Sequence, residues 1–186
     1  TVLIRYAEPI KDGDLFFHLV YGQAILDTGN LKPDHTVYSW TDTSNETVYC
    51  AWLGQVVLHL VDQVGGFPLL FTLRYLCLFA VLGMIGFFFL RVRFPDPVLA
   101  VLAILVTAIT AYSGVFIKPE LFSMVFMAGL AFLYFQAKLV LFEDRSYKLL
   151  WGLPLLFLVW INTHGVWMFG VILFTLLVAG ELMNQY

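Results

Sequence analysis

Charged residues are scarce in this sequence, and it contains no basic cluster. Asp, Glu, Lys and Arg make up 12% of the 186 residues, whereas soluble domains carry about 25%. The net charge is −3, and a chain without a basic patch lacks the electrostatic footprint of nucleic-acid binding, so we exclude nucleic acid as a partner. Cysteine is also rare: Cys50 lies in a polar segment and Cys77 in an apolar run. This placement predicts neither a metal site made of cysteines nor a disulfide.

Hydrophobic residues are abundant instead, and they form long uninterrupted runs. They account for 61% of the chain, with a mean hydropathy of +0.86. A helix needs about 20 mostly apolar residues to span a bilayer. We expect five membrane helices, two of them short because the polar residues 162–165 divide a 34-residue run between Leu149 and Leu182. The expected helices cover residues 67–90, 97–117, 121–142, 149–161 and 166–182.

The start of the sequence predicts one more crossing. The chain opens with Thr1, and residues 1–4 read like the last turn of an apolar helix. We therefore expect residues 1–4 to be the end of a truncated first span, with further sequence before Thr1 and after Tyr186. On this interpretation, residues 1–186 form a single membrane domain of an all-α polytopic membrane protein.

Basic residues in the short connections predict the orientation of these helices. Arg91 and Arg93 follow the first full span, and Arg145 and Lys148 follow the third. Two spans separate the two connections, so both lie on one side of the membrane, which the positive-inside rule makes cytoplasmic. The loops expected to face outside are residues 5–66, 118–120 and 162–165.

The long first loop, residues 5–66, is predicted to carry two helices on the membrane interface. Asp14 precedes an apolar stretch that ends before Gly29, and these residue types are common at the two ends of a helix. From Trp52 to Val64 the apolar residues recur at helical spacing. Both segments are apolar enough to lie on a membrane. Residues 30–49 between them are expected to form an ordered loop or a pair of strands.

Two carboxylates precede the first of these helices. Asp12 and Asp14 are two residues apart, and His18 follows Asp14 by one helical turn on the same face. Paired carboxylates suit Mg²⁺ or Mn²⁺ holding a phosphate, and a single Asp could act as a general base. The alternative is that Asp12 and Asp14 only cap the helix.

Other polar groups lie in or between the apolar runs. Arg74 is seven residues inside its span, about 10 Å along the axis, where a charge is either functional or reaches back to the interface. Lys118 and Glu120 flank Pro119 in a turn that could also be a plain connector. Asn162 and His164 interrupt an apolar run, which costs free energy unless their polar groups are satisfied or used. The predicted topology places all these groups, with Asp12 and Asp14, toward one membrane face.

Four motifs in order resemble bacterial glycosyltransferases of the GT-C superfamily, and they cover nearly the whole chain. The first is Asp12-Gly13-Asp14-Leu15-Phe16-Phe17-His18-Leu19 with the later Gly22 and Ile25-Leu26-Asp27-Thr28-Gly29. The others are Pro33-Asp34 with Tyr38-Ser39-Trp40, then Lys118-Pro119-Glu120-Leu121-Phe122-Ser123, and finally Trp160-Ile161-Asn162-Thr163-His164-Gly165.

This resemblance implies a GT-C-like helix bundle in the bacterial inner membrane, with the first loop outside the cytoplasm. It also implies transfer of a sugar from a polyprenyl-phosphate carrier to an acceptor at the outer face. Asp14 would be the base or the metal ligand, and Asp12 its partner, with Mg²⁺ or Mn²⁺ as the expected ion. We expect the remaining polar groups to bind substrate, because cations neutralise a phosphate. These residues are His18, Arg74, Lys118, Glu120, Asn162 and His164.

Two other functions remain open. Many relatives carry a His-Glu pair where this chain has Cys50-Ala51, and this departure favours a non-catalytic GT-C-like subunit bound to other membrane proteins. The third possibility is a transporter. Transporters often show inverted repeats and charges near mid-membrane, whereas here the charges gather at one face and no repeat is evident.

Overall fold

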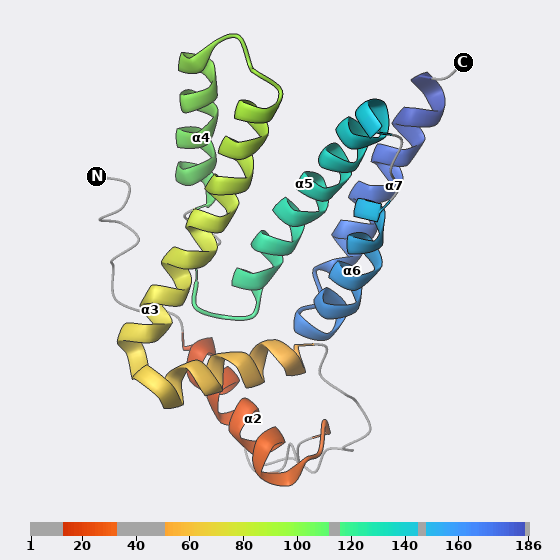
Figure 1. Cartoon of the computed structure of the whole chain (residues 1–186). Coiled ribbons are helices and arrows are strands. Elements are labelled where there is room, and N and C mark those ends of the chain that lie inside the picture. The colour runs from red at the N-terminus through yellow and green to blue at the C-terminus, as the bar shows by residue number, and fades with distance from the viewer. Residues whose placement is uncertain (1–12, 33–50, 112–115, 145–147, 185–186) are drawn as a thin grey trace.

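In the computed structural model (Figure 1), residues 13–32, 51–111, 116–144 and 148–184 are described, and every regular element among them is a helix. Three predictions fall outside these residues. They are the end of a first span at residues 1–4, the position of Asp12, and most of the polar segment 30–49.

Helix α2 (Asp14–Thr28) follows Gly13 and ends at Gly29. Asp14 is its first residue, so its carboxylate lies in the first turn, where it interacts favourably with the helix dipole. Gly29 has a φ of 66°, and its N–H donates to the carbonyl of Ile25 at 2.9 Å. A left-handed residue at this position favours glycine, which explains why the helix ends here.

Helix α3 (Trp52–Arg91) is bent sharply at Gly66, where φ is 59° and ψ is −157°. The bend divides it into a first arm, residues 52–65, and a second arm, residues 67–91. Glycine adopts this conformation far more readily than other residues. The two segments predicted at residues 52–64 and 67–90 therefore lie in one helix that changes direction, which Figure 1 shows as an elbow.

The remaining helices follow the second arm of α3 in a bundle. They are α4 (Pro97–Ala111), α5 (Glu120–Asp144), the short 3-10 helix η3 (Lys148–Trp151), α6 (Gly152–Thr163) and α7 (Trp167–Asn184). Among the described residues, three helices are long and apolar enough to cross a membrane, namely α3, α5 and α7. Helix α4 and the η3–α6 segment are apolar but shorter.

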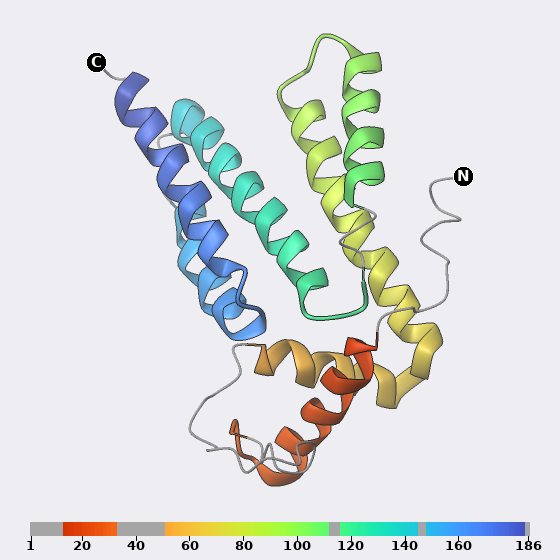
Figure 2. The same cartoon turned by 180° about the vertical axis from the view of Figure 1, so that it is seen from behind.

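Figures 1 and 2 show α2 and the first arm of α3 together at one end of the bundle. Helices α5 and α7 begin at this end, and α6 finishes there. The turn between α3 and α4 and the last residues of α7 lie at the opposite end. The topology therefore gathers the residues before α5 and between α6 and α7 beside the start of α2.

Apolar packing holds this end together. One buried cluster joins α2, both arms of α3 and the residue that precedes the turn into α5; its members are Leu15, Leu19, Leu58, Leu70 and Ile117. Helices also approach closely, since a Cβ on Gly22 of α2 would lie 2.4 Å from the carbonyl oxygen of Gln55 in α3. A second cluster joins α5 to α6 and is built from Leu130, Leu153 and Trp160.

Candidate functional site

A chain of charged side chains runs across the end of the bundle where α2 and α5 begin. The ammonium of Lys118 lies 3.2 Å from Oε2 of Glu120 and 3.7 Å from Oδ2 of Asp14. Lys118 stands in the turn before α5, Glu120 is the first residue of α5, and Asp14 is the first residue of α2. Both carboxylates thus lie at helix N-termini, which favour negative charge. The side chain of Lys118 is 18% exposed and that of Asp14 is 67% exposed, so solvent or a substrate can reach Asp14.

His164 extends this chain from the break between α6 and α7. It caps α6, and its own N–H donates to the carbonyl of Trp160 at 3.0 Å. Its Nε2 lies 3.9 Å from Oε1 of Glu120, and its Nδ1 lies 3.1 Å from Oγ of Ser123. Burial lowers the pKa of His164; Glu120 raises this pKa and Lys118 lowers it, both by a smaller amount. A lowered pKa favours the neutral imidazole at neutral pH.

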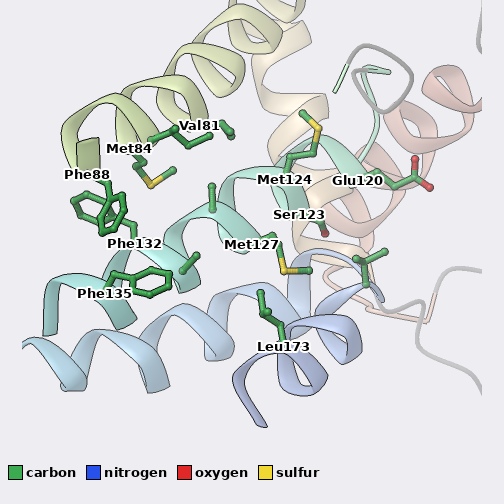
Figure 3. Close-up of a pocket in the computed structure, with 14 residues that line it drawn as sticks. Val81, Met84, Phe88, Glu120, Ser123, Met124, Met127, Phe132, Phe135 and Leu173 are labelled. Atoms are coloured by element: carbon green, nitrogen blue, oxygen red, sulfur yellow. The ribbon is translucent and has the colours of Figure 1, made fainter. Parts of the chain in front are cut away.

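An apolar groove of about 640 Å³ begins at this charged cluster. It runs between the second arm of α3, helix α5 and the start of α7, and its volume lies in the range of pockets that hold small molecules. Figure 3 shows Glu120 and Ser123 at one end, Met127 in the middle, and Phe88 and Phe135 at the other end. Glu120 and Ser123 are thus the polar lining residues at the end beside the charged cluster, and the rest of the lining is apolar.

The predicted site residue Asn162 has its polar atoms bound within the protein. Its Oδ1 accepts a hydrogen bond from Nε1 of Trp52 at 2.9 Å, and its Nδ2 donates to the carbonyl of Leu158 at 2.8 Å. The first contact joins α6 to the first arm of α3. Asn162 therefore holds the break between α6 and α7 against that arm.

His18 is buried between α2 and the first arm of α3. Nε2 of Gln55 donates to its Nδ1 at 3.3 Å. Gln55 is fully buried, its Oε1 has no hydrogen-bond partner among the described residues, and His59 lies buried one turn further along α3. His18 thus shares the first turns of α2 with Asp14 but points into the protein.

Arg74 lies in the second arm of α3 and is buried. Its guanidinium packs 4.6 Å from the ring centroid of Phe71 and 6.0 Å from that of Tyr75, both in its own helix. Both are cation–π contacts, which stabilise a buried guanidinium. Both partner rings belong to α3 itself.

Asp12 and Asp14 are the predicted ligands of a divalent cation, and only Asp14 lies among the described residues. Within those it describes, no three His, Cys, Asp or Glu side chains gather as a metal site requires. Asp14 and Glu120 both offer carboxylate oxygens, but the ammonium of Lys118 contacts both of them. The described residues therefore do not form a metal site. The prediction that Asp12 and Asp14 bind Mg²⁺ or Mn²⁺ stays a prediction.

Sequence reasoning missed several polar residues that the structure brings to this end. Ser123 and Trp160 belong to two of the motifs, yet neither is charged, and they contact each other only because α5 packs against α6. Gln55 and His59 had a usable signal, since they are spaced four residues apart in a segment otherwise rich in apolar residues. That spacing predicts a polar stripe on one face of the first arm.

The resemblance to GT-C glycosyltransferases rests on the four motifs in this sequence. Those motifs lie in the first turns of α2, in the turn before α5 and at the end of α6, with one outside the described residues. No protein-family model, no curated protein and no solved structure matches the chain.

Proposed function

We propose that this protein is a multi-pass membrane glycosyltransferase of GT-C type. It transfers a sugar from a polyprenyl-phosphate carrier to an acceptor at the outer face of the bacterial inner membrane. One observation carries the proposal: Glu120 and Ser123 line the apolar groove and also contact Lys118 and His164. A polar head group and a long apolar tail on one molecule would fit such a continuous site.

The outer faces of the helices support insertion in a membrane. Helices α4 and α7 expose many large apolar side chains, among them Val98, Leu102, Ile109, Phe169, Ile172 and Leu176. Apolar patches of this extent are rare on soluble monomers, where they mark membrane or protein contacts. Within the described part of the chain, three helices have the length and composition to cross a bilayer, which agrees with lipid as the surrounding medium.

The charged cluster supports a phosphate-linked head group. Lys118 provides a cation, and cations bind phosphate through short charge-assisted hydrogen bonds. His164 lies beside it with Nε2 toward Glu120, within reach of the same region. The prenyl tail would lie in the groove beyond Ser123.

Asp14 is the residue best placed to act as general base. Its carboxylate is the most exposed of the cluster and lies 3.7 Å from the ammonium of Lys118. In the proposed reaction Asp14 takes the proton of an acceptor hydroxyl while that oxygen bonds to the anomeric carbon. The bond between the anomeric carbon and the phosphate oxygen breaks, and the electron pair stays on the phosphate. Lys118 stabilises that charge as it develops.

One observation favours the alternative of a non-catalytic subunit in a larger membrane complex. Lys118 contacts two carboxylates, so Asp14, Lys118 and Glu120 carry a net charge of −1 without a ligand. An ion-paired turn of this kind could serve only to fix α2 against α5. A catalytic site would have to exchange one of these contacts for the phosphate.

Sugar transfer by the purified protein distinguishes the two functions. Radiolabelled polyprenyl-phosphate sugars are incubated with the protein in lipid nanodiscs, and wild type is compared with Asp14→Asn. The matched control is Asp27→Asn, at the other end of α2. Transfer that is lost in Asp14→Asn but kept in Asp27→Asn supports the enzyme. If wild type transfers no sugar and purifies with other membrane proteins, the chain is the non-catalytic subunit.

A further inference from the structure

Three side chains form a hydrogen-bonded relay between α5 and the end of α6. Nε1 of Trp160 donates to Oγ of Ser123 at 2.9 Å, and Oγ of Ser123 lies 3.1 Å from Nδ1 of His164. Trp160 is fully buried and Ser123 is 4% exposed. Water therefore has little access to these hydrogen bonds and does not readily replace the partners of the Trp160 indole or the Ser123 hydroxyl.

The chemistry of the three groups limits where the protons lie. The indole nitrogen of Trp160 can only donate, so Oγ of Ser123 accepts that proton. The oxygen of Ser123 keeps a second lone pair, so it can either donate its own proton to Nδ1 of His164 or accept a proton from that atom. The position of Glu120 favours the first arrangement, because a proton on Nε2 of the neutral ring then faces Oε1 of Glu120, 3.9 Å away.

The packing of Trp160 keeps the relay rigid. Its ring stacks on Phe157, with centroids 5.9 Å apart, and lies 5.8 Å from the ring of Phe126. A Cβ on Gly170 of α7 would come within 2.3 Å of this indole ring, so α7 closes its remaining side. The indole cannot swing away without moving two helices, and the position of its N–H is fixed.

We propose that Ser123 and Trp160 are positioning residues that hold His164 as its Nε2–H tautomer, so that it donates a hydrogen bond to the phosphate of a prenyl-phosphate ligand. This inference rests on the proposed function for its ligand. It assigns His164 the role of a neutral donor beside the cationic Lys118, and it leaves Asp14 as the base. Burial, which lowers the pKa of His164, agrees with a neutral ring.

Nitrogen NMR of the imidazole rings tests the tautomer without any need for sugar transfer. Protein labelled with ¹⁵N at histidine side chains is studied in nanodiscs at neutral pH, and the His164 signals are assigned by their loss in His164→Gln. We expect a proton on Nε2 and none on Nδ1. A proton on Nδ1, or on both nitrogens, would overturn the proposal.

Two variants test the positioning role. Ser123→Ala removes the hydroxyl and should give a mixture of tautomers, with transfer lowered about 5-fold, as the loss of one hydrogen bond implies. Ser123→Thr keeps a hydroxyl and should retain the wild-type tautomer. An unchanged tautomer in Ser123→Ala would show that the relay does not determine it.

Addition of farnesyl phosphate tests the donor role. We expect the Nε2 signal of His164 to shift on binding in wild type and to shift less in Ser123→Ala. If the signal does not move although farnesyl phosphate binds, or if this ligand does not bind at all, the donor role is wrong. A shift without sugar transfer from any carrier would leave the donor role in place and reject the proposed enzyme.

Discussion

Nε1 of Trp52 donates a hydrogen bond of 2.9 Å to Oδ1 of Asn162, although the two residues are 110 positions apart. Trp52 begins the first arm of α3, and Asn162 lies in the last turn of α6. The bond therefore ties the arm that crosses the end of the bundle to the segment that carries His164. The geometry of the charged cluster depends on this junction. Asp14 lies on α2, which packs against the first arm of α3, and His164 directly follows α6.

Replacing Trp52 by Phe should lower the stability of the protein by about 1 kcal/mol, the net value of one hydrogen bond, because Asn162 loses a partner. The measurement is the thermal unfolding midpoint of the purified protein in detergent. The matched control is Trp151→Phe, since that side chain is 78% exposed. Equal midpoints for both variants would show that the junction contributes nothing to stability.

Gly54 marks the closest approach at the same junction. A Cβ added there would lie 2.7 Å from the carbonyl oxygen of Thr163 and 2.9 Å from Cβ of Pro119. We expect Gly54→Ala to destabilise the protein by about 1–3 kcal/mol, because neither the backbone of Thr163 nor the ring of Pro119 can move aside cheaply. Gly83→Ala in the second arm of α3 is the control, as nothing lies within 4 Å of its added Cβ. An alanine at Gly54 that is tolerated as well as one at Gly83 would disprove this close contact.

Lys118 should determine the affinity for an anionic head group. We predict that Lys118→Met weakens binding of farnesyl phosphate about 10- to 100-fold, the range expected when a hydrogen bond to a charged group is lost. Binding is measured by titration in nanodiscs. Lys148→Met, at the start of η3 and separated from His164 by the length of α6, should bind as wild type does. Similar affinities for wild type and Lys118→Met would show that the phosphate does not bind at Lys118.

His164 should make stability depend on pH in one direction. Burial lowers its pKa in the folded protein below the ordinary value, which is about 6.5. As the pH falls below that value, the unfolded chain takes up a proton before the folded protein does, so stability is lost down to the folded pKa. Above the ordinary value His164 contributes no pH dependence.

The pH prediction is checked by thermal unfolding at several values between pH 5 and pH 8. Wild type should lose more stability than His164→Gln as the pH is lowered, while all other groups are common to both proteins and cancel in the comparison. Parallel curves for the two proteins would mean that His164 is not a buried neutral imidazole.

The convergence of charges was accessible from the sequence because it depends only on which loops share one end of the helices. Counting apolar runs puts Lys118 and His164 at the same end as the start of the first loop. The structure has the ammonium of Lys118 3.7 Å from Asp14 and Nε2 of His164 3.9 Å from Glu120. Pairings of this kind need only topology, since charged groups at one end of a small bundle have few other partners.

The contacts that depend on how the helices pack could not be predicted from the sequence, because loop order does not determine them. The structure has Arg74 over the ring of Phe71 and His18 against Gln55, contacts that the sequence did not predict, and the substrate-binding roles of Arg74 and His18 stay predictions. The relay from Trp160 to Ser123 requires the relative rotation of α5 and α6, about which the spacing of apolar residues says little. The groove likewise arises from the gap between three helices and not from any one of them.

Photo-cross-linking with a lipid probe tests whether the charged cluster and the groove form one binding site. A prenyl phosphate with a photoreactive group in its first isoprene units is irradiated with the protein in nanodiscs, and the labelled residues are identified by mass spectrometry. The variant Met127→Trp fills the middle of the groove, and Met183→Trp places the same side chain on the exposed end of α7. We predict labelling of Met124 and Met127 in wild type, which Met127→Trp abolishes and Met183→Trp preserves. Labelling confined to the outer faces of α4 and α7, and equal in both variants, would mean that the groove does not hold the lipid.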